Sequence, residues 1–516
     1  MAKVALIRPP ALMPEGRVGT WVITPPIATA YLAGSLRAAG HKPVVVDAMG
    51  EAPFHRTVCF DNRAVAVGLP IDEIVARIPS DTEVIGVSCM FSQDWPYLRR
   101  ILEAIRRRFP KTLIVAGGEH ITALPLYTLE TCSEIDLCVL GEGEEAIVEI
   151  ADRVNAQRDL ADLKGIAVRL DGRPVLTSPR TRIRNVDAIP PPAWDLTPVD
   201  TYLDARFSFG VGNRRTIPIV ATRGCPYQCT FCSNPTMWTT RWYARDPSAV
   251  LDEIQGYIDR FGVTNIDFYD LTAVVKRDWI LSFCRQIEER GMKFTWQLPS
   301  GTRSEALDSE VCQALYRSGC CNLTYAPESG SPAVLERIKK RVHLDKLLSS
   351  IRAAEIAGIV TSATIIFGFP DQSRWECWQT VAFMARMALA GVYDVHAFIF
   401  IPYPGSELFN RLRESGELAK LDEEYFLSLL SMFALATPVS RCLKISNREL
   451  GALRFLGLLT FYGVQYTRRP WRLARLFYNI VSKRQESYLD KTLGDLIQRK
   501  LTARTASMDS LQARQV

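Results

Sequence analysis

The chain has 516 residues, of which 47% are hydrophobic and 23% charged, and its formal net charge is +6. At about 150 residues per domain, this length predicts two to four domains, each able to bury a core of its own. The small net charge argues against a dedicated nucleic-acid-binding protein, and 13 cysteines in so long a chain are too sparse for a secreted disulfide scaffold.

The apolar segments do not suggest a membrane-spanning or secreted protein. The first residues, MAKVALIRPP, lack the apolar run and cleavage site of a signal peptide. Charged residues interrupt the two most apolar segments, 381–402 and 450–466, so that no stretch reaches about 18 uncharged apolar residues. We therefore expect a protein of the reducing cytoplasm in which most cysteines are buried as small apolar residues.

Residues 1–150 alternate short apolar runs with helical patterns. Strands are predicted at 4–7, 44–46, 84–88, 113–116 and 137–140, and helices at 27–39 and 97–108. Such alternation is typical of a parallel sheet covered by helices on both faces, here a flavodoxin- or Rossmann-like domain. Ligands of these sheets bind beyond the carboxyl ends of the strands, where Gly117, Gly118 and Gly141 permit close backbone approach.

The rest of the chain falls into three parts. Residues 151–205 are polar and proline-rich, which predicts a linker with a short strand pair. Residues 206–405 resume the strand–helix alternation and predict a partial (β/α)6 barrel. Its strands are expected near 217–221, 265–269, 293–297, 321–326, 361–367 and 395–401. Residues 406–516 are expected to be mainly helical, with a disordered polar end.

A cysteine motif follows the first barrel strand. Residues 223–235 read RGCPYQCTFCSNP, which places Cys225, Cys229 and Cys232 in a Cys-x3-Cys-x2-Cys spacing. Thiolates favour iron–sulfur or zinc sites. A zinc site would need a fourth ligand, and no further Cys or His lies nearby. The pattern therefore favours a [4Fe–4S] cluster with one open iron over zinc and over three unrelated buried cysteines.

With an aromatic residue just before its last cysteine, this motif resembles that of the radical S-adenosylmethionine (SAM) superfamily. The resemblance implies that the open iron chelates the amino and carboxylate groups of SAM. Reduction then cleaves SAM to methionine and a 5′-deoxyadenosyl radical. Phe231 matches the aromatic position whose backbone contacts adenine.

Three further residues match segments that contact SAM in that superfamily. Residues 325–335 resemble the ESGS segment, which implies that Glu328 contacts the ribose; the alternative is a carboxylate near a helix N-cap. Asp270 lies where relatives place acids near the SAM amino group, and the alternative is a strand-end turn residue. Arg303 is expected to pair with the SAM carboxylate or to be a surface arginine.

Two segments later in the barrel carry the resemblance further. Residues 364–370 resemble the glycine-containing fifth strand that passes under adenine, where Gly368 would allow close approach. Residues 401–406 resemble a segment near the barrel mouth of the cobalamin-binding branch. Tyr403 in that segment is the candidate catalytic residue facing substrate; the alternative is a packed loop tyrosine.

Three pieces of the first 150 residues resemble the cobalamin-binding domain of class B radical SAM enzymes. They are residues 25–34, 116–123 and 140–144. The resemblance implies that cobalamin is bound by Gly117, Gly118, His120, Gly141 and Glu142. His120 is otherwise a simple loop histidine, and the domain is otherwise a degenerate module used only for packing. A pyridine-dinucleotide site is disfavoured, because no Gly-x-Gly-x-x-Gly follows the first strand.

The cobalamin signature Asp-x-His-x-x-Gly is absent. The comparable loop reads SCMFSQD over residues 88–94. Many radical SAM relatives also lack the signature, which implies cobalt without a protein histidine ligand.

The resemblance covers roughly residues 1–410 and implies a cobalamin-dependent radical SAM methyltransferase. It would act on an unactivated carbon of a small molecule or natural product, with electrons from a donor such as flavodoxin or ferredoxin. One alternative is a non-methylating relative, either an anaerobic porphyrin-ring cyclase or a ring-contraction enzyme. The other is a cobalamin-binding sensor module, against which the cysteine motif and the Glu328 segment argue.

The C-terminal part leaves two interpretations open. Residues 450–480 are mostly apolar, interleaved with Arg468, Arg469, Arg472 and Arg475. The segment is either a helical cap on the barrel with solvated arginines, or an interfacial helix that rests on an anionic bilayer. The second interpretation adds a peripheral membrane contact to the expected partners.

Overall fold

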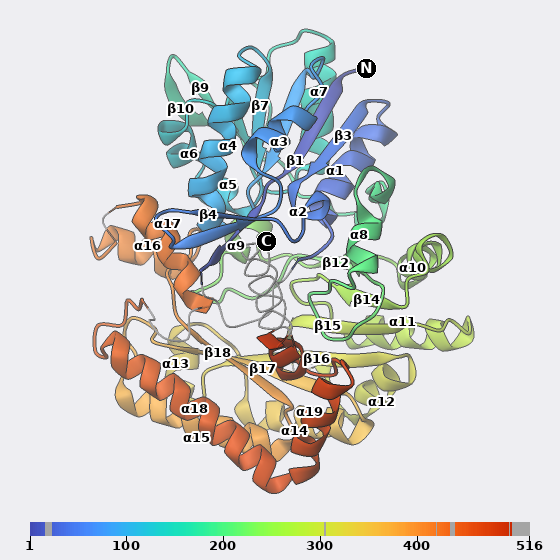
Figure 1. The fold of residues 1–516 in the computed structure, drawn as a ribbon, viewed down its shortest axis with the longest axis vertical. Helices are drawn as coiled ribbons and strands as arrows, with labels where there is room; N and C mark the ends of the chain where they lie inside the picture. The colour runs from blue at the N-terminus through green and yellow to red at the C-terminus, as the bar shows by residue number, and fades with distance from the viewer. Residues whose placement is uncertain (16–22, 304–305, 419, 434–438, 495, 498–516) are drawn as a thin grey trace, which may run out of the picture.

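The computed structural model describes residues 1–15, 23–303, 306–418, 420–433, 439–494 and 496–497. Figure 1 shows two α/β units, one above the other, with the last helices of the chain along the lower unit. The polar end that the sequence predicts to be disordered lies outside the described residues. No helix in the described ranges is both long enough and apolar enough to cross a membrane.

The N-terminal unit is built on a seven-stranded sheet in the order β10-β9-β8-β7-β6-β1-β3. Its parallel strands are β1 (Lys3–Arg8), β3 (Lys42–Asp47), β6 (Val84–Ser88), β7 (Leu113–Gly117) and β8 (Leu137–Val139). All five coincide with predicted strands. Two antiparallel strands, β9 (Ile166–Leu170) and β10 (Arg173–Leu176), extend the sheet; they are the strand pair expected within residues 151–205.

Helices cover both faces of this sheet, because its strands are apolar on both sides. Val4 and Leu6 of β1 share one core with α1 (Ile27–Ala38) and α7 (Glu144–Asn155). Ala5 and Ile7 share the opposite core with helices of the other face. Those helices include α3 (Ile71–Arg77), α4 (Trp95–Arg108), α5 (Glu119–Ala123) and α6 (Pro125–Thr131). The alternation along β1 thus confirms the doubly covered sheet.

A small three-stranded antiparallel sheet was not predicted. It consists of β2 (Ala11–Pro14), β5 (Ala64–Val67) and β4 (Arg56–Cys59), in that order. The short helix α2 (Ala48–Glu51) follows β3. Each strand has four residues, too few for a periodic pattern to stand out from a loop.

The second unit is a six-stranded parallel sheet in sequential order, which confirms the partial barrel. Its strands are β11 (Thr216–Ile219), β14 (Asn265–Phe268), β15 (Thr295–Thr302), β16 (Cys320–Glu328), β17 (Val360–Phe367) and β18 (Asp394–Ile399). The helices outside it include α10 (Pro247–Phe261), α11 (Arg277–Glu289), α12 (Ser309–Arg317), α14 (Leu344–Ala357) and α15 (Arg374–Ala390).

Apolar and polar residues alternate along the barrel strands. Ile266, Trp296 and Leu323 pack outward in the core shared with the helices. Because neighbouring residues of a strand face opposite sides, buried polar residues line the interior. They include Asp267, Gln297, Asn322, Ser362 and Asp394. The interior of the barrel is therefore polar below its mouth.

The C-terminal region is helical, as predicted. It contains α16 (Glu407–Glu414), α17 (Glu423–Ser428), α18 (Asn447–Arg468) and α19 (Pro470–Val481). Beyond α19, the backbone N–H of Tyr488 donates to Asp394 at 2.7 Å, and the Lys491 ammonium donates to the carbonyl of Ser208 at 2.7 Å. This segment therefore bridges the last barrel strand and the chain just before the first.

Candidate functional site

The three cysteines lie on an irregular loop at the carboxyl end of β11. The loop follows β12 (Thr222–Arg223) and ends at α9 (Asn234–Trp238). Gly224 begins it with φ of +87°, and a Cβ there would lie 2.1 Å from the Arg241 carbonyl oxygen. Only glycine fits this turn. The backbone N–H of Cys232 donates to the carbonyl of Cys229 at 3.1 Å, which tightens the loop between those two residues.

The thiols are partly buried beside two cations. Burial raises the pKa of Cys225 and Cys229, and Lys340 and Arg303 oppose that rise at both; burial also raises the pKa of Cys232 to about 12. Among the described residues, no three His, Cys, Asp or Glu side chains gather closely enough to hold a metal ion. The donor set, three soft ligands on one loop, nevertheless fits a [4Fe–4S] cluster with one open iron.

Glu328 ends β16 in a strained conformation next to this loop. Its φ is +64°, a region that costs a non-glycine residue about 1 kcal/mol. The register of β16 against β17 also shifts between Tyr325 and Glu328. The Glu328 carboxylate accepts from the Lys340 ammonium at 3.0 Å and lies 3.4 Å from the Thr364 hydroxyl. Irregular backbone thus aims a buried carboxylate into the mouth of the barrel.

Phe231 and Arg303 join the same cluster. The Lys340 ammonium lies 5.9 Å from the centre of the Phe231 ring. The Arg303 guanidinium lies 3.7 Å from the centre of the Tyr227 ring, within the cysteine loop, and donates to the Arg341 carbonyl. Both side chains and Glu328 therefore surround the cysteines. The sequence did not single out Lys340 as a site residue, and its place after the ESGS segment was the available signal.

The alternative role of Glu328 near a capped helix finds little support. Ser331 precedes the short helix α13 (Pro332–Arg337) but makes no side-chain cap. Its backbone N–H donates instead to the Ser329 hydroxyl at 3.1 Å. Glu328 is bound to Lys340 rather than to the helix end.

Asp270 is buried where β14 ends, beside the strand that leads into the cysteine loop. One carboxylate oxygen accepts from the backbone N–H of Ala221 at 3.3 Å. The other is buried and has no hydrogen-bond partner in the described structure. Burial raises the pKa of Asp270 to about 6. An unpaired buried carboxylate oxygen at the mouth of a barrel is a feature that a bound ligand would satisfy.

Gly368 and Tyr403 lie elsewhere around the mouth. Gly368 has φ of +82°, and a Cβ there would lie 2.9 Å from Leu450 of α18, so its nearest neighbours belong to the C-terminal region. The Tyr403 hydroxyl accepts from the backbone N–H of Ser92 at 2.8 Å and lies 3.4 Å from the Gln93 amide oxygen. Tyr403 thus connects the last barrel loop to the N-terminal unit.

The N-terminal residues lie at the carboxyl ends of β7 and β8. Gly117 ends β7, and Gly118 follows it with φ of +110°, where a Cβ would lie 2.5 Å from the Cys89 carbonyl oxygen. Gly141, after β8, has φ of +72°. At Gly118 and Gly141 the backbone conformation itself favours glycine.

His120 lies in the interior rather than on a loop surface. It is fully buried, its Nδ1 lies 2.9 Å from the Ser92 hydroxyl, and its ring stacks on Trp95 with centroids 4.9 Å apart. Burial lowers its pKa to about 3. The imidazole is therefore neutral and held by packing within the N-terminal unit.

Glu142 joins the two units through a buried ion-pair network. Its carboxylate oxygens lie 3.2 Å from Arg223 and 3.3 Å from Arg182, and one accepts from the backbone N–H of Ile183 at 2.9 Å. Glu144 lies 2.5 Å from the same Arg223. Burial alone lowers the pKa of Arg223, but Glu144 and Glu142 raise it above its usual value. The network therefore fixes Arg223, two residues before Cys225, against the loop after β8.

Comparison with known proteins identifies two domain families in the chain. Residues 22–151 match the family model of the B12 binding domain, and residues 219–384 match that of the radical SAM superfamily. The chain is a cobalamin-dependent radical SAM enzyme. The sensor alternative is thereby excluded, because the chain is a radical SAM enzyme as well as a cobalamin-binding protein.

Individual relatives cover most of the chain. An uncharacterized methyltransferase of Pyrococcus horikoshii is 27% identical over 89% of this chain and 92% of its own. An anaerobic magnesium-protoporphyrin IX monomethyl ester cyclase of Cereibacter sphaeroides is 27% identical over 88% of this chain and 69% of its own. The solved structure of the cobalamin-dependent radical enzyme OxsB, with aqua-cobalamin and SAM bound, shares the fold. Its TM-score is 0.67 at 14% identity, over 98% of this chain and 80% of that one.

The cofactors of this radical SAM enzyme are a [4Fe–4S] cluster, SAM and cobalamin. The edge of the N-terminal sheet fits cobalamin held without a histidine ligand. Among the described histidines of that unit, His41 and His120 are buried, and His55 lies just before β4, a strand of the small antiparallel sheet. The loops after β6, β7 and β8 instead offer backbone groups at the side that meets the barrel.

Replacing Cys225, Cys229 and Cys232 by Ala should abolish both the charge-transfer absorbance of the reconstituted enzyme and its cleavage of SAM, because three irons lose their ligands. Absorption spectra and quantification of 5′-deoxyadenosine measure the two effects. Replacing the buried Cys89, Cys312 and Cys377 by Ala is the matched control and should leave both intact. Release of 5′-deoxyadenosine by the first variant would disprove the ligand assignment.

Replacing Glu142 by Gln should destabilise the cofactor-free protein by about 3 kcal/mol, because a buried arginine pair loses its shared carboxylate. Replacing the exposed Glu145 by Gln, in the same segment, should change stability by less than about 0.5 kcal/mol. Thermal unfolding of both variants without cofactor gives the comparison. A Glu142 variant that unfolds like the wild type and loses only cobalamin would instead favour a direct contact with the cofactor.

Proposed function

We propose that this enzyme is a methyltransferase that adds a methyl group to an unactivated carbon of a small molecule. The observation that carries the proposal is the presence of a B12 binding domain and a radical SAM domain in one chain. Hydrogen bonds from the cysteine loop and from Tyr403 to the N-terminal unit join the two near their predicted cofactor sites. The methyltransferase relative from Pyrococcus horikoshii, which matches nearly the full length of both chains, supports the same reaction.

The residues around the cysteine loop suit the binding of SAM. We assign Cys225, Cys229 and Cys232 to the cluster, with Phe231 at the adenine, Arg303 at the SAM carboxylate and Glu328 at the ribose. Asp270 has a buried unpaired oxygen available for the SAM amino group. Lys340 holds the Glu328 carboxylate at 3.0 Å and so orients it before SAM binds.

The remaining residues shape the backbone and the packing around the proposed cofactor sites. Gly117, Gly118 and Gly141 keep the backbone at the sheet edge free of side chains, where cobalamin would lie. Gly368 lets α18 approach the strand end. We propose that Tyr403 lines the substrate space between the units. Its hydroxyl contacts Ser92 and Gln93 of the N-terminal unit, which holds the side chain there. His120 supports the loop that carries Ser92.

When bound, the cluster and SAM supply a carbon-centred radical, and cobalamin supplies the methyl group. The chain supplies orientation and exclusion of water. Electrons come from an external carrier, which we propose to be a flavodoxin or ferredoxin. None of the 13 cysteines forms a disulfide, which suits a reducing cytoplasm.

A second candidate is cyclisation without methyl transfer. It is favoured by the cyclase relative, which matches the chain at the same 27% identity. The two functions share cofactors and the cysteine motif, so the product distinguishes them.

The enzyme is reconstituted with its cluster and cobalamin and given SAM, a reductant and an extract of the cells that make it. It should increase the mass of one metabolite by one CH2 unit. Mass spectrometry with methyl-labelled SAM follows the transfer. The matched controls are the enzyme without cobalamin and the triple cysteine variant, and neither should form the product. A product that has lost hydrogen and carries no label would show that the enzyme is a cyclase.

A further inference from the structure

The last long helix, α19, buries mainly polar residues and exposes large apolar ones. Two of its three buried residues are polar, Arg472 and Asn479. The Arg472 guanidinium donates to the carbonyls of Val392 and Gly391 at 3.1 Å each, and the Asn479 amide donates to Asp490 at 2.9 Å. The side of α19 that faces the barrel therefore packs through polar side chains that make hydrogen bonds.

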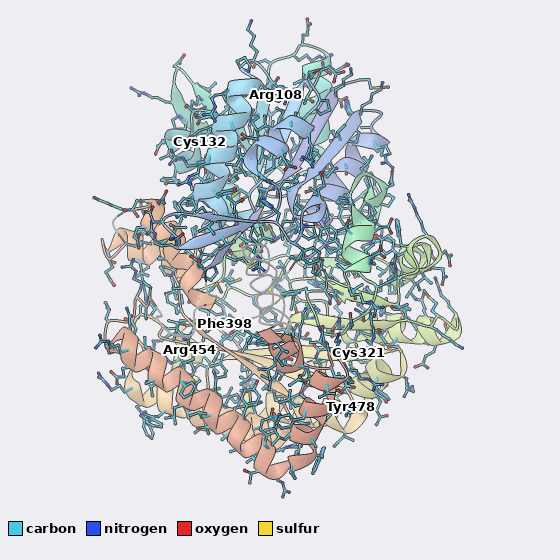
Figure 2. All side chains as sticks on the ribbon, in the orientation of Figure 1. Arg108, Cys132, Cys321, Phe398, Arg454 and Tyr478 are labelled. Atoms are coloured by element: carbon cyan, nitrogen blue, oxygen red, sulfur yellow. The ribbon has the colours of Figure 1, made fainter. Side chains whose placement is uncertain are left out.

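The opposite side of α19 is apolar and exposed. Trp471 is 62% exposed, Phe477 62%, Tyr478 56% and Val481 84%; Tyr478 is labelled in Figure 2. A surface helix of a globular protein normally buries its apolar side and exposes its polar side. The reversal leaves a row of large aromatic and aliphatic side chains without cover in the described structure.

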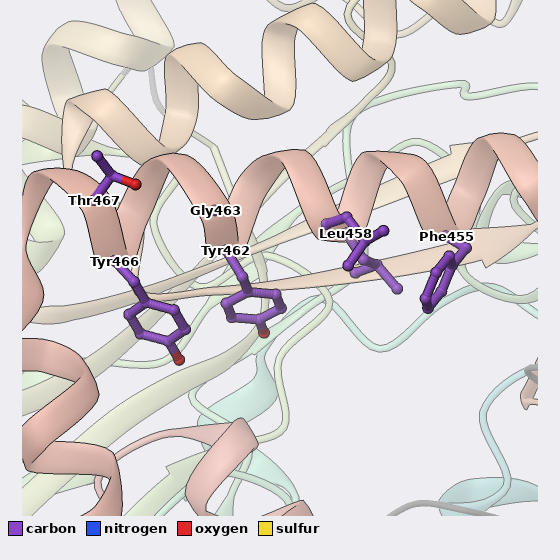
Figure 3. Close-up of a pocket in the computed structure, with 7 residues that line it drawn as sticks. Phe455, Leu458, Tyr462, Gly463, Tyr466 and Thr467 are labelled. Carbon is purple, nitrogen blue, oxygen red and sulfur yellow. The ribbon is translucent and has the colours of Figure 1, made fainter.

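The preceding helix, α18, shows the same reversal in part. It buries Arg454 and Gln465 and exposes Phe455 and Leu459 at 62% and 55%. These exposed residues border a groove of about 610 Å³ that runs along α18. Figure 3 shows Phe455, Tyr462 and Tyr466 on one side of the helix, facing this space.

The charge along the two helices is mainly positive, although Glu449 in the first turn of α18 and Glu486 after α19 are acidic and pair with Arg374 and Arg475. Residues 450–485 contain seven arginines and lysines and no aspartate or glutamate. Arg469 and Arg472 turn inward to Glu355, at 2.8 and 3.0 Å. This corrects the expectation that all four arginines of the segment are solvated. Arg468 before α19 and Lys483 and Arg484 after it are exposed, so basic side chains flank the apolar row at both ends.

We infer that α18 and α19 dock on an anionic membrane surface. Aromatic side chains between basic residues are the pattern of a helix that lies in the interface, with its apolar side in the headgroup region and its cations on anionic lipids. An excess of basic over acidic side chains is complementary to such a surface and opposes contact with a second copy of the same face. The contact goes beyond methyl transfer and does not depend on it.

Co-sedimentation of the full chain with vesicles tests the contact. Vesicles containing about one third phosphatidylglycerol in phosphatidylcholine should bind the wild type at low salt, and binding should weaken as salt rises. Trp471→Ser with Phe477→Ser should lower the partition coefficient about tenfold or more. The matched control is Phe54→Ser with Val58→Ser, which removes side chains 75% and 51% exposed in the N-terminal unit and should not change binding.

Charge variants distinguish binding to anionic lipid from nonspecific hydrophobic adsorption. Lys483→Gln with Arg484→Gln should reduce binding to anionic vesicles about fivefold per residue. Arg472→Gln should instead lower thermal stability, since that guanidinium is buried against the barrel. Retention of the wild type in the supernatant at low salt would overturn the inference. So would equal binding to pure phosphatidylcholine, or a dimer without vesicles that the Trp471 and Phe477 changes dissociate.

Discussion

The ion pairs of Arg223 with Glu142 and Glu144 hold the two halves of this enzyme in one arrangement. All three side chains are buried, and Arg182 completes the network. A buried guanidinium must keep its carboxylates, because leaving one charge unpaired costs several kcal/mol. Since Arg223 lies two residues before Cys225, the same interaction that stabilises the interface also sets the position of the cysteine loop.

Two further contacts reinforce that arrangement on other sides of the loop. The Ser233 hydroxyl, next to Cys232, donates to Glu119 of the N-terminal unit. Tyr403, from the loop after the last barrel strand, reaches Ser92. The cysteine loop is thus attached to the N-terminal unit before and after its three cysteines.

The sequence predicted the elements whose signal is local. Apolar runs such as those of β1 and β6 indicated buried parallel strands, and the cysteine spacing indicated the cluster loop. It could not predict that Glu142 pairs with arginines 40 and 81 residues away, nor that His120 points into the core. The inward turn of Arg469 and Arg472 depends on Glu355, a residue of α14. Each of these outcomes is decided by a tertiary partner that local patterning does not reveal.

The proposed methyl transfer is tested most directly by counting the products of SAM, because SAM would supply both the methyl group that cobalamin carries and the radical. With substrate present, the enzyme should release S-adenosylhomocysteine and 5′-deoxyadenosine in equal amounts, one of each per methylated product. Release of 5′-deoxyadenosine with no S-adenosylhomocysteine would contradict the account.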